Sequence, residues 1–269
     1  MKLKELAFDP ISVLEGISAA QDHVRISTTG WKETSTRDTI STSFKRIPYK
    51  SSIKGSEPIY SILNYVSSPE STKLLTSLKG KGPYIVNDKQ INDLLNGVVG
   101  ACKQIMHTLD PDVILYPKSS SPLTKHFVDL LHKAYPKITV SDEAFVKKIL
   151  KAGDEDALLN TQHPDWKKFA DENPDAVDDL KKTLKRHIKD GNLELKKLYK
   201  PYVKFIKNFI EMKDASNTLD QVIEKRILVV DDVFSTGSTM LEMFRQLREF
   251  EPEAISGLTI FKRTSETLH

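Results

Sequence analysis

The sequence predicts an α/β fold in which a mainly parallel sheet is flanked by helices and interrupted by a helical insertion. Apolar runs of strand length occur at residues 112–116, 226–230 and 255–261, and each is bounded by turn residues. Amphipathic helical patterns alternate with these runs. A charge-rich segment at residues 153–222 separates the first run from the other two. Strands that alternate with helices indicate a parallel sheet with helices on its faces.

The clearest helical pattern begins after Asn87 and ends at Leu109, because apolar residues recur there at intervals of three and four. Asn87 or Asp88 is suited to cap this helix, and Asp110 followed by proline ends it. Cys102 lies on the apolar stripe. We therefore expect Cys102 to be a packing residue and not a nucleophile.

The run at residues 112–116 reads as a buried parallel strand, and a second amphipathic helix follows it. Ser121 and Pro122 are suited to the N-cap and the first position of this helix. Residues 137–140 and 144–150 are candidate strands. After residue 226 a strand, a helix from about 238 to 250 and a last strand complete the pattern.

The chain is expected to divide into two parts. Residues 1–86 form an N-terminal region that is partly irregular and packs on the core. Residues 87–269 form the core, which a helical insertion interrupts at about 153–222. Within the insertion, helical patterns lie around 176–188 and 193–212.

Composition excludes several classes of function. The 269 residues include 40 Lys and Arg against 37 Asp and Glu, so the formal charge of +3 does not indicate a nucleic-acid-binding protein. A single cysteine excludes an internal disulfide framework and a cysteine-based zinc cluster. No apolar stretch has the length of a signal peptide or a membrane span. We therefore expect a cytoplasmic protein with no membrane partner.

The residues that carry chemistry follow the strand at 226–230. This strand should deliver Asp231 and Asp232 to the carboxyl edge of the sheet, where ligands of α/β folds bind. The next residues supply hydroxyls, a glycine that lets backbone approach a ligand, and a helix N-terminus that attracts phosphate. These residues are Ser235, Thr236, Gly237, Ser238 and Thr239.

The two acids cannot hold a phosphate, but they can accept hydrogen bonds from vicinal hydroxyls or attract a divalent cation. A sugar phosphate satisfies both halves of this segment. The simpler interpretation, in which the hydroxyls cap a helix and the acids are a solvated strand end, fits any one of these residues but not their combination.

This segment, ILVVDDVFSTGST, resembles the phosphoribosyl pyrophosphate (PRPP) binding motif of type I phosphoribosyltransferases, and its form is closest to the ComF-like branch. The resemblance implies a Rossmann-like parallel sheet. It also implies that Asp231 and Asp232 hold the ribose hydroxyls in a catalytic role and that residues 235–239 wrap the 5-phosphate. A receiver domain also opens with ILVVDD, but it needs about a hundred residues after that strand. Only residues 233–269 follow here.

Family membership requires a second anion loop for pyrophosphate. Four residues that follow the strand at 112–116 stand in that place, because they combine one positive charge, three hydroxyls and the N-terminus of a helix. They are Lys118, Ser119, Ser120 and Ser121. Taken alone, this loop composition is more typical of plain helix capping.

Other lysines are weaker candidates. Lys147, Lys148 and Lys151 stand at the entry to the insertion, where relatives carry a mobile flap, and they could reach diphosphate as point charges. Lys262 lies in a last strand that resembles the segment by which the hypoxanthine-guanine branch contacts the base. A solvated surface position is the simpler interpretation of each.

The sequence therefore predicts a Mg²⁺-dependent transferase that moves the 5-phosphoribosyl group of PRPP to an acceptor nitrogen, with release of pyrophosphate. Its partners are expected to be PRPP and an acceptor, and a homodimer is left open. No histidine has a recognisable base position. Two alternatives stay open: a non-catalytic PRPP or nucleotide sensor whose insertion contacts a partner, and a phosphoribosyl hydrolase or phosphorylase that differs in its nucleophile.

Overall fold

The structure is a computed structural model that describes most of the chain after residue 57 and three short N-terminal strands. The described residues are 17–20, 23–26, 41–47, 57–66, 69–118, 122–151, 153–163, 165–189, 193, 198–213, 220–235 and 237–264. Ser119, Ser120, Ser121 and Thr236 therefore lie outside the described residues.

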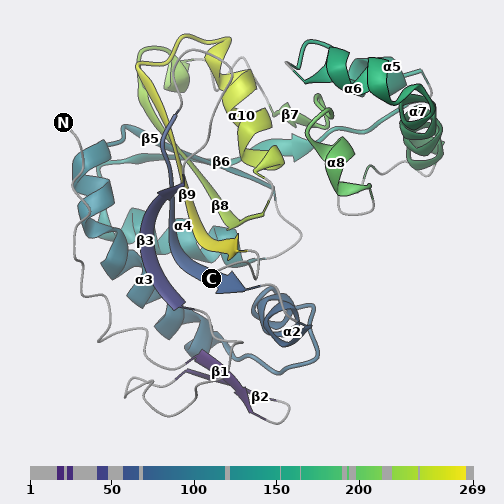
Figure 1. Ribbon diagram of the computed structural model, residues 1–269. Helices are drawn as coiled ribbons and strands as arrows, with labels where there is room; N and C mark the ends of the chain where they lie inside the picture. Colours follow the sequence, from purple (N-terminus) through teal and green to yellow (C-terminus); the bar gives the residue numbers. More distant parts are fainter. Residues whose placement is uncertain are drawn as a thin grey trace.

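Strands and helices alternate over much of this length (Figure 1). The strands are β1 (Ile17–Ala20), β2 (His23–Ile26), β3 (Ser41–Ile47), β4 (Ile59–Val66), β5 (Val113–Pro117), β6 (Thr139–Lys147), β7 (Ile210–Met212), β8 (Arg226–Phe234) and β9 (Ala254–Thr264). The helices are α2 (Pro69–Leu78), α3 (Asp88–Leu109), α4 (Leu123–Ala134), α5 (Glu155–Leu158), α6 (Trp166–Glu172), α7 (Pro174–Lys189), α8 (Lys200–Val203) and α10 (Ser238–Arg248).

The main sheet has seven strands in the order β3-β4-β9-β8-β5-β6-β7. The five inner strands β4, β9, β8, β5 and β6 are mutually parallel, and β3 and β7 pair antiparallel at the two edges. Strands β1 and β2 form a separate antiparallel pair. The predicted α/β fold is confirmed as a mostly parallel mixed sheet flanked by helices.

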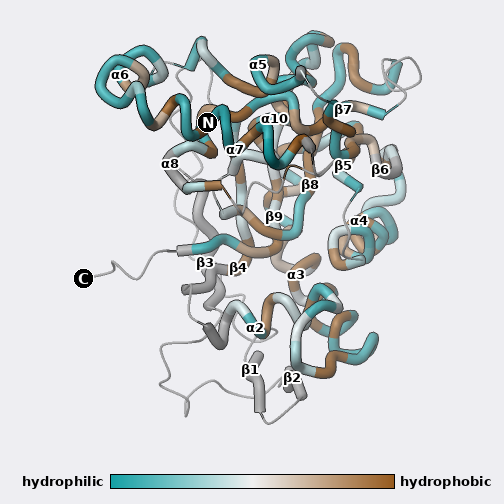
Figure 2. Tube along the Cα trace, turned by 90° about the vertical axis from the view of Figure 1, so that its right-hand side faces the viewer, coloured by the Kyte–Doolittle hydropathy of each residue, from teal (hydrophilic) through white to brown (hydrophobic). Residues whose placement is uncertain are grey.

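Side chains that alternate along the central strands build a core on each face of the sheet. In β8, Leu228 and Val230 pack with α3 and α4 on one face, whereas Ile227 and Val229 pack with α10 and the insertion on the other. All four side chains are buried. Both faces are thus covered by helices, as a parallel sheet requires. Figure 2 shows the apolar colour concentrated in the sheet strands.

The predicted long helix is confirmed as α3. Asn87 caps it by accepting a hydrogen bond from the backbone N–H of Gln90 at 2.9 Å, and the Gln90 side chain accepts in return from the Asn87 N–H. Asp110 ends the helix in a left-handed conformation with φ 41°. Cys102 is fully buried, and burial raises the pKa of its thiol, so it is a packing residue as expected.

The start of α4 and the region after it differ from the prediction. Pro122, expected at the first helical position, is the N-cap instead, and α4 begins at Leu123. The two candidate strands at 137–140 and 144–150 are one strand, β6, whose two parts pair with β5 on either side of an irregularity between Ser141 and Phe145. The residues between the two apolar runs are polar, and this polarity hid the continuity.

The insertion contains short helices and returns to the sheet as a strand. The helix predicted around 176–188 is confirmed as α7. The helix predicted at 193–212 is wrong: of the residues described in that range, only α8 is helical, and β7 pairs with β6 at the sheet edge. Asn208, with φ 56°, breaks any helical path between α8 and β7.

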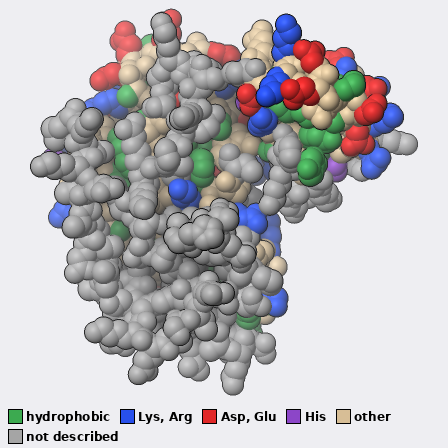
Figure 3. Space-filling model, viewed as in Figure 1, with side chains coloured by type: hydrophobic (Ala, Val, Ile, Leu, Met, Phe, Trp, Pro, Cys, Tyr) green, Lys and Arg blue, Asp and Glu red, His purple; other side chains and the backbone are tan. Residues whose placement is uncertain are grey.

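Figure 1 shows helices α5 to α8 standing out from the sheet beside α10, and Figure 3 shows acidic and basic side chains interspersed over them. None of the helices that the structure describes is both long and apolar enough to cross a membrane. The domain division at residues 86 and 87 stays a prediction. Strand β4, which lies before that boundary, pairs in parallel with β9 inside the main sheet.

Candidate functional site

Those residues singled out in the sequence that the structure describes lie at or after the carboxyl ends of the parallel strands. Phe234 at the end of β8 is in register with Lys262 near the end of β9. Pro117 at the end of β5 is in register with Phe145 of β6, and the Lys118 N–H donates to the Phe145 carbonyl at 2.6 Å. The carboxyl ends of neighbouring parallel strands lie at the same edge of the sheet, so segments that are far apart in the sequence meet there.

The acidic pair lies in the second half of β8. Asp232 is buried, and its Oδ1 forms an ion pair with the Nζ of Lys79 at 2.7 Å. Asp231 is half-buried, and its Oδ1 accepts a hydrogen bond from the Asp232 backbone N–H at 2.8 Å. Lys79 follows the last residue of α2, so α2 closes over the acids from one side of the strand.

The pKa of Asp231 is raised to about 7. Removal from water is the main cause, because a desolvated carboxyl group favours its neutral form, and the charge of Asp232 adds to it. The hydrogen bond from the Asp232 N–H and the charge of Lys79 act in the opposite direction. A ligand that donates hydrogen bonds to the Asp231 carboxylate, or a cation bound beside it, would offset the repulsion between the Asp231 and Asp232 carboxylates.

Gly237 shapes the turn between β8 and α10. Its φ of +77° lies in the left-handed region, which favours glycine. A Cβ atom at this position would lie 2.7 Å from Cζ of Phe234 and 2.8 Å from Cε2 of the same ring. The turn therefore requires glycine both for its conformation and for space.

Helix α10 begins at Ser238, directly after this glycine, and no side chain caps its N-terminus. Ser238 and Thr239 are both half-buried in its first turn, and Ser235 is exposed at the end of β8. An uncapped N-terminus offers backbone N–H groups and the positive end of the helix dipole to an anion. The sequence-predicted phosphate loop therefore has the local geometry of an anion site.

The second predicted anion loop is described at its two ends. Lys118 is exposed after β5, and α4 begins at Leu123 with no side-chain cap. In the first turn of α4, the Thr124 hydroxyl is fully buried, and no partner is found for it within the described ranges. Buried hydroxyl groups ordinarily have a hydrogen-bond partner, and that of Thr124 is an exception within the described residues.

The remaining lysines are placed as follows. Lys147 is exposed at the last position of β6, and Lys148 is half-buried with its N–H donating to the Phe209 carbonyl at 3.0 Å. Lys151 is exposed before α5. Lys262 is half-buried at the carboxyl end of β9. They share the edge of the acidic pair without contacting it through any ion pair in the described part of the chain.

The acidic pair fits a divalent cation that arrives with its ligand. No cluster of three or more metal-ligating side chains is found within the described residues. Mg²⁺ is usually held by one or two carboxylates together with phosphate oxygens of a substrate. Asp231 and Asp232 supply that number of carboxylates, and Lys79 already offsets part of their charge.

An open cavity of about 440 Å³ lies at the opposite, amino edge of the sheet. Its walls include Asp112 and Arg226, which are joined by an ion pair of 2.9 Å. The helix N-terminus and the acidic pair are not part of its lining. We place the candidate site at the carboxyl edge, because the acidic pair and the helix N-terminus without a side-chain cap lie there.

Sequence reasoning missed Lys79. This residue is 153 positions from Asp232, and no local pattern specifies so distant a contact. The available signal was the run Lys79-Gly80-Lys81-Gly82-Pro83, a basic turn that ends a helix. Gly80 adopts φ +73° there.

A family model and a solved structure show similarity to this chain. Residues 186–269 match the family model described as phosphoribosyl transferase domain, which is less than half of the chain. No curated protein matches. Among solved structures, the chain is similar to the purine phosphoribosyltransferase from Pyrococcus horikoshii Ot3, with 11% identity, 65% of this chain and 90% of that chain covered, and a TM-score of 0.33.

A TM-score of 0.33 supports no conclusion by itself. The family match is more informative, because it includes β8, the glycine turn, α10 and β9. The part of the chain that carries the acidic pair and the anion loop is thus similar in sequence to the phosphoribosyl transferase domain.

Proposed function

We propose that the protein is a phosphoribosyltransferase that moves the 5-phosphoribosyl group of PRPP to an acceptor nitrogen and releases pyrophosphate. The observation that carries the proposal is the arrangement at the end of β8. Two adjacent carboxylates, Asp231 and Asp232, are followed within five residues by a glycine turn and an uncapped helix N-terminus. This arrangement suits a ribose and its 5-phosphate.

The chemistry asks mainly for positioning and charge. The bond between the ribose C1 atom and the diphosphate oxygen breaks, its electron pair leaves with diphosphate, and the acceptor nitrogen forms the new bond. Positive charge develops on the ribose ring during this step, so carboxylates near the ring are stabilising. In this proposal Asp231 and Asp232 hold the ribose hydroxyls and act as the catalytic pair.

Residues of the two loops would hold the two phosphate ends. Backbone N–H groups after Gly237, with the hydroxyls of Ser235, Thr236, Ser238 and Thr239, bind the 5-phosphate. Lys118 with Ser119, Ser120 and Ser121 binds pyrophosphate, and the N-terminus of α4 adds its dipole. Lys147, Lys148 and Lys262 are further candidates for contacts to diphosphate or acceptor.

A Mg²⁺ ion held by the acidic pair and by the diphosphate would supply Lewis-acid stabilisation of the leaving group. The chain's own residues do the rest. They orient the ribose, and helix N-termini neutralise phosphate charge. Lys79 keeps the carboxylate of Asp232 in place from the side of α2.

The binding alternative, a PRPP or nucleotide sensor, is favoured by one observation. The buried carboxylate of Asp232 is already paired with the protein's own ammonium group at 2.7 Å. A site whose carboxylate is already neutralised by the protein can bind a ligand without catalysing its reaction.

Calorimetry with PRPP and Mg²⁺ tests the proposal. The wild-type chain should bind PRPP only when Mg²⁺ is present, and the double variant Asp231→Asn with Asp232→Asn should lose binding at least about 100-fold, because the hydroxyl acceptors lose their charge. Circular dichroism should show the fold unchanged. A double variant that binds PRPP like the wild type would contradict the proposal.

Release of pyrophosphate distinguishes the enzyme from the sensor. The protein is incubated with PRPP, Mg²⁺ and a panel of nitrogen bases, with water as the acceptor in the control reaction. Release that depends on one base identifies a transferase, and release without any base identifies a hydrolase. Binding of PRPP without release under any condition identifies the sensor.

A further inference from the structure

Helix α10 supplies the N–H groups of the candidate phosphate site, so whatever fixes this helix also fixes the site. On one side the sheet holds it closely. A Cβ atom at Gly257 of β9 would lie 2.3 Å from the Met240 sulfur and 3.1 Å from Cζ of Phe244. The helix can therefore approach the sheet this closely only because residue 257 is glycine.

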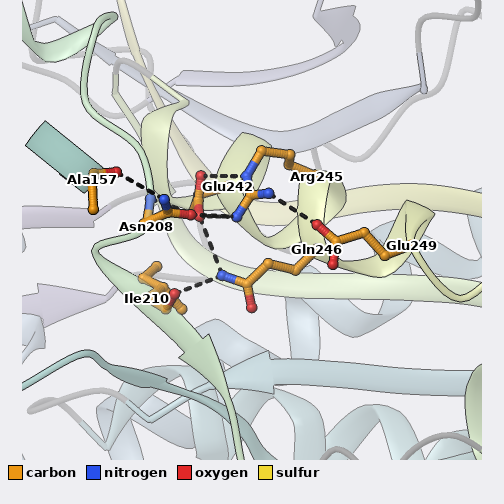
Figure 4. A network of polar contacts seen from close by, with 7 residues as sticks. All are labelled: Ala157, Asn208, Ile210, Glu242, Arg245, Gln246 and Glu249. Atoms are coloured by element: carbon orange, nitrogen blue, oxygen red, sulfur yellow. Dashed lines mark hydrogen bonds and ion pairs between the residues drawn. The ribbon is translucent and has the colours of Figure 1, made fainter. Parts of the chain in front are cut away.

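On its other side α10 is held by a buried carboxylate. The Glu242 side chain is 4% exposed and accepts hydrogen bonds from three residues (Figure 4). Its Oε1 accepts from the Asn208 backbone N–H at 2.9 Å and from Nη2 of Arg245 at 2.8 Å. Its Oε1 also accepts from the Gln246 amide at 3.2 Å, and its Oε2 accepts from Nε of Arg245 at 3.1 Å.

Asn208 extends this network to the base of the insertion. Its side-chain amide donates to the carbonyl of Ala157 in α5 at 2.8 Å, and its side-chain oxygen accepts from Arg245 at 2.8 Å (Figure 4). Nearby, the Lys207 N–H donates to the Leu158 carbonyl at 2.8 Å. The outgoing and returning ends of the insertion are therefore fastened together and to α10.

Gln246 adds a third connection. Its amide donates to the Ile210 carbonyl of β7 at 2.6 Å as well as to Glu242. Strand β7 is the sheet edge that the insertion contributes. Glu242 is thus the shared acceptor of a network that joins α10, the base of the insertion and the edge of the sheet.

We propose that Glu242 is a positioning residue of the phosphate site, which places the first turn of α10 by fixing this helix to the base of the insertion. Glu242 is four residues after Ser238 and so lies one helical turn from the N–H groups of the site. A buried carboxylate left without its donors is strongly unfavourable, so the helix and the donor segment hold one relative position.

The consequence is a coupling between the insertion and the phosphate ligand. A ligand that orders the first turn of α10 also stabilises the contact of Glu242 with Asn208. A change at the base of the insertion reaches the phosphate site through the same contact. The inference rests on the proposed function for the identity of its ligand, PRPP, but the network itself exists in the protein without ligand.

Hydrogen exchange measured by mass spectrometry on the full chain tests the inference, with Glu242→Gln as the variant. Its matched control is Glu249→Gln, which makes the same change on the same helix. Glu249 is 63% exposed, and among the described residues its side chain accepts only from Nη1 of the same Arg245, at 3.0 Å. We expect Glu242→Gln to increase exchange about tenfold in peptides covering 205–210 and 237–242, and Glu249→Gln to change neither.

Binding of PRPP with Mg²⁺ supplies the second measurement. We expect Glu242→Gln to raise the dissociation constant about tenfold and Glu249→Gln to leave it unchanged, because displacement of a positioning group weakens a site by such factors. Faster exchange confined to 205–210, or equal PRPP affinity in the two variants, would overturn the inference. If the wild type binds no PRPP, the proposed function fails, while the exchange of the ligand-free protein still decides the coupling.

A second variant keeps the test valid if Glu242→Gln does not fold. Asn208→Gly retains the backbone N–H that Glu242 accepts and suits the left-handed φ of 56°. It removes only the side-chain bonds to Ala157 and Arg245. We expect it to increase exchange in both peptides by a smaller factor, and no change in 237–242 would again overturn the inference.

Discussion

The two ends of β8 place aspartate side chains in opposite electrostatic environments. At the amino end, Asp112 accepts hydrogen bonds from the backbone N–H and the guanidinium of Arg226, and these bonds lower its pKa to about 2. At the carboxyl end, burial and the adjacent Asp232 raise the pKa of Asp231 to about 7. The amino end of β8 thus contacts a carboxylate, that of Asp112, whose charge is compensated, whereas its carboxyl end holds one, that of Asp231, whose charge is not.

This difference separates a structural ion pair from a candidate site. At the amino edge Arg226 pairs with Asp112, and Asp110 also accepts from Arg226 at 2.6 Å. These three residues form a structural cluster of compensated charges beside the cavity. At the carboxyl edge the protein holds two carboxylates together at a cost in stability, which is typical of sites where a ligand or a cation completes the arrangement.

The largest expected effect comes from Gly237→Ala. The new methyl group would clash with the Phe234 ring, and the left-handed backbone adds about 1–2 kcal/mol of strain. We expect PRPP affinity to fall about 100-fold, because the turn can no longer present its N–H groups. Calorimetry measures the affinity, and thermal unfolding measures the strain.

Gly153→Ala is the matched control for this variant. Gly153 also has a positive φ, of 100°, but a Cβ atom there would meet nothing within 4 Å. The control should lose stability without losing affinity. Equal losses of affinity in both variants would mean that the glycine turn does not position the ligand.

The second effect concerns the stability of the ligand-free protein. The pKa of Asp231 is about 7 in the folded state and near 3.8 when unfolded, so the folded state loses stability as the pH rises towards and through 7. Asp231→Asn removes this loss. We expect the variant to exceed the wild type in free energy of unfolding by on the order of 2 kcal/mol more at pH 8 than at pH 5.

Denaturant unfolding at the two pH values measures this gain. The same variant should bind PRPP more weakly, so a gain in stability would accompany a loss of function. A variant that is less stable than the wild type at pH 8 would show that Asp231 is a structural residue like Asp112.

The smallest effect is expected at the amino end. The pKa of Asp112 is lowered, so its contribution to stability is present above about pH 4 and is lost as the pH falls through 2. Its side chain is 36% exposed, and solvent therefore reduces the contribution to below about 1 kcal/mol. Asp112→Asn should lower the melting temperature slightly at pH 7 and not at pH 2. PRPP affinity should not change. A measurable change would show that the ion pair at the amino end of β8 influences ligand binding at its carboxyl end.

The sequence predicted those elements whose conformation is set by residues a few positions apart in the chain. The glycine turn, α3 and the strand containing Asp231 follow from spacing, capping and turn chemistry within a few positions. The identity of Asp231 as an acid at a strand end was visible in the sequence. Its raised pKa was not, because that shift depends on how deeply the fold buries the pair.

Contacts between distant segments could not be predicted in the same way. Lys79 meets Asp232 only after folding has brought the end of α2 beside the carboxyl end of β8. Residues 210–212 form a strand because the edge of β6 pairs with them, although their spacing with earlier apolar residues resembles a helix. The burial of Glu242 likewise depends on a segment 34 positions earlier, which no local pattern specifies.

The base of the insertion has a consequence for how this protein could change in length. Leu159 and Ile206 form an antiparallel bridge, and the Asn160 N–H donates to the Phe205 carbonyl at 2.7 Å. The chain therefore leaves and returns through neighbouring points. The residues between this bridge's two strands could therefore be shortened, lengthened or replaced, in evolution or by engineering, even by a tight turn. The sheet and helix α10 would keep their connections to the two ends of the insertion.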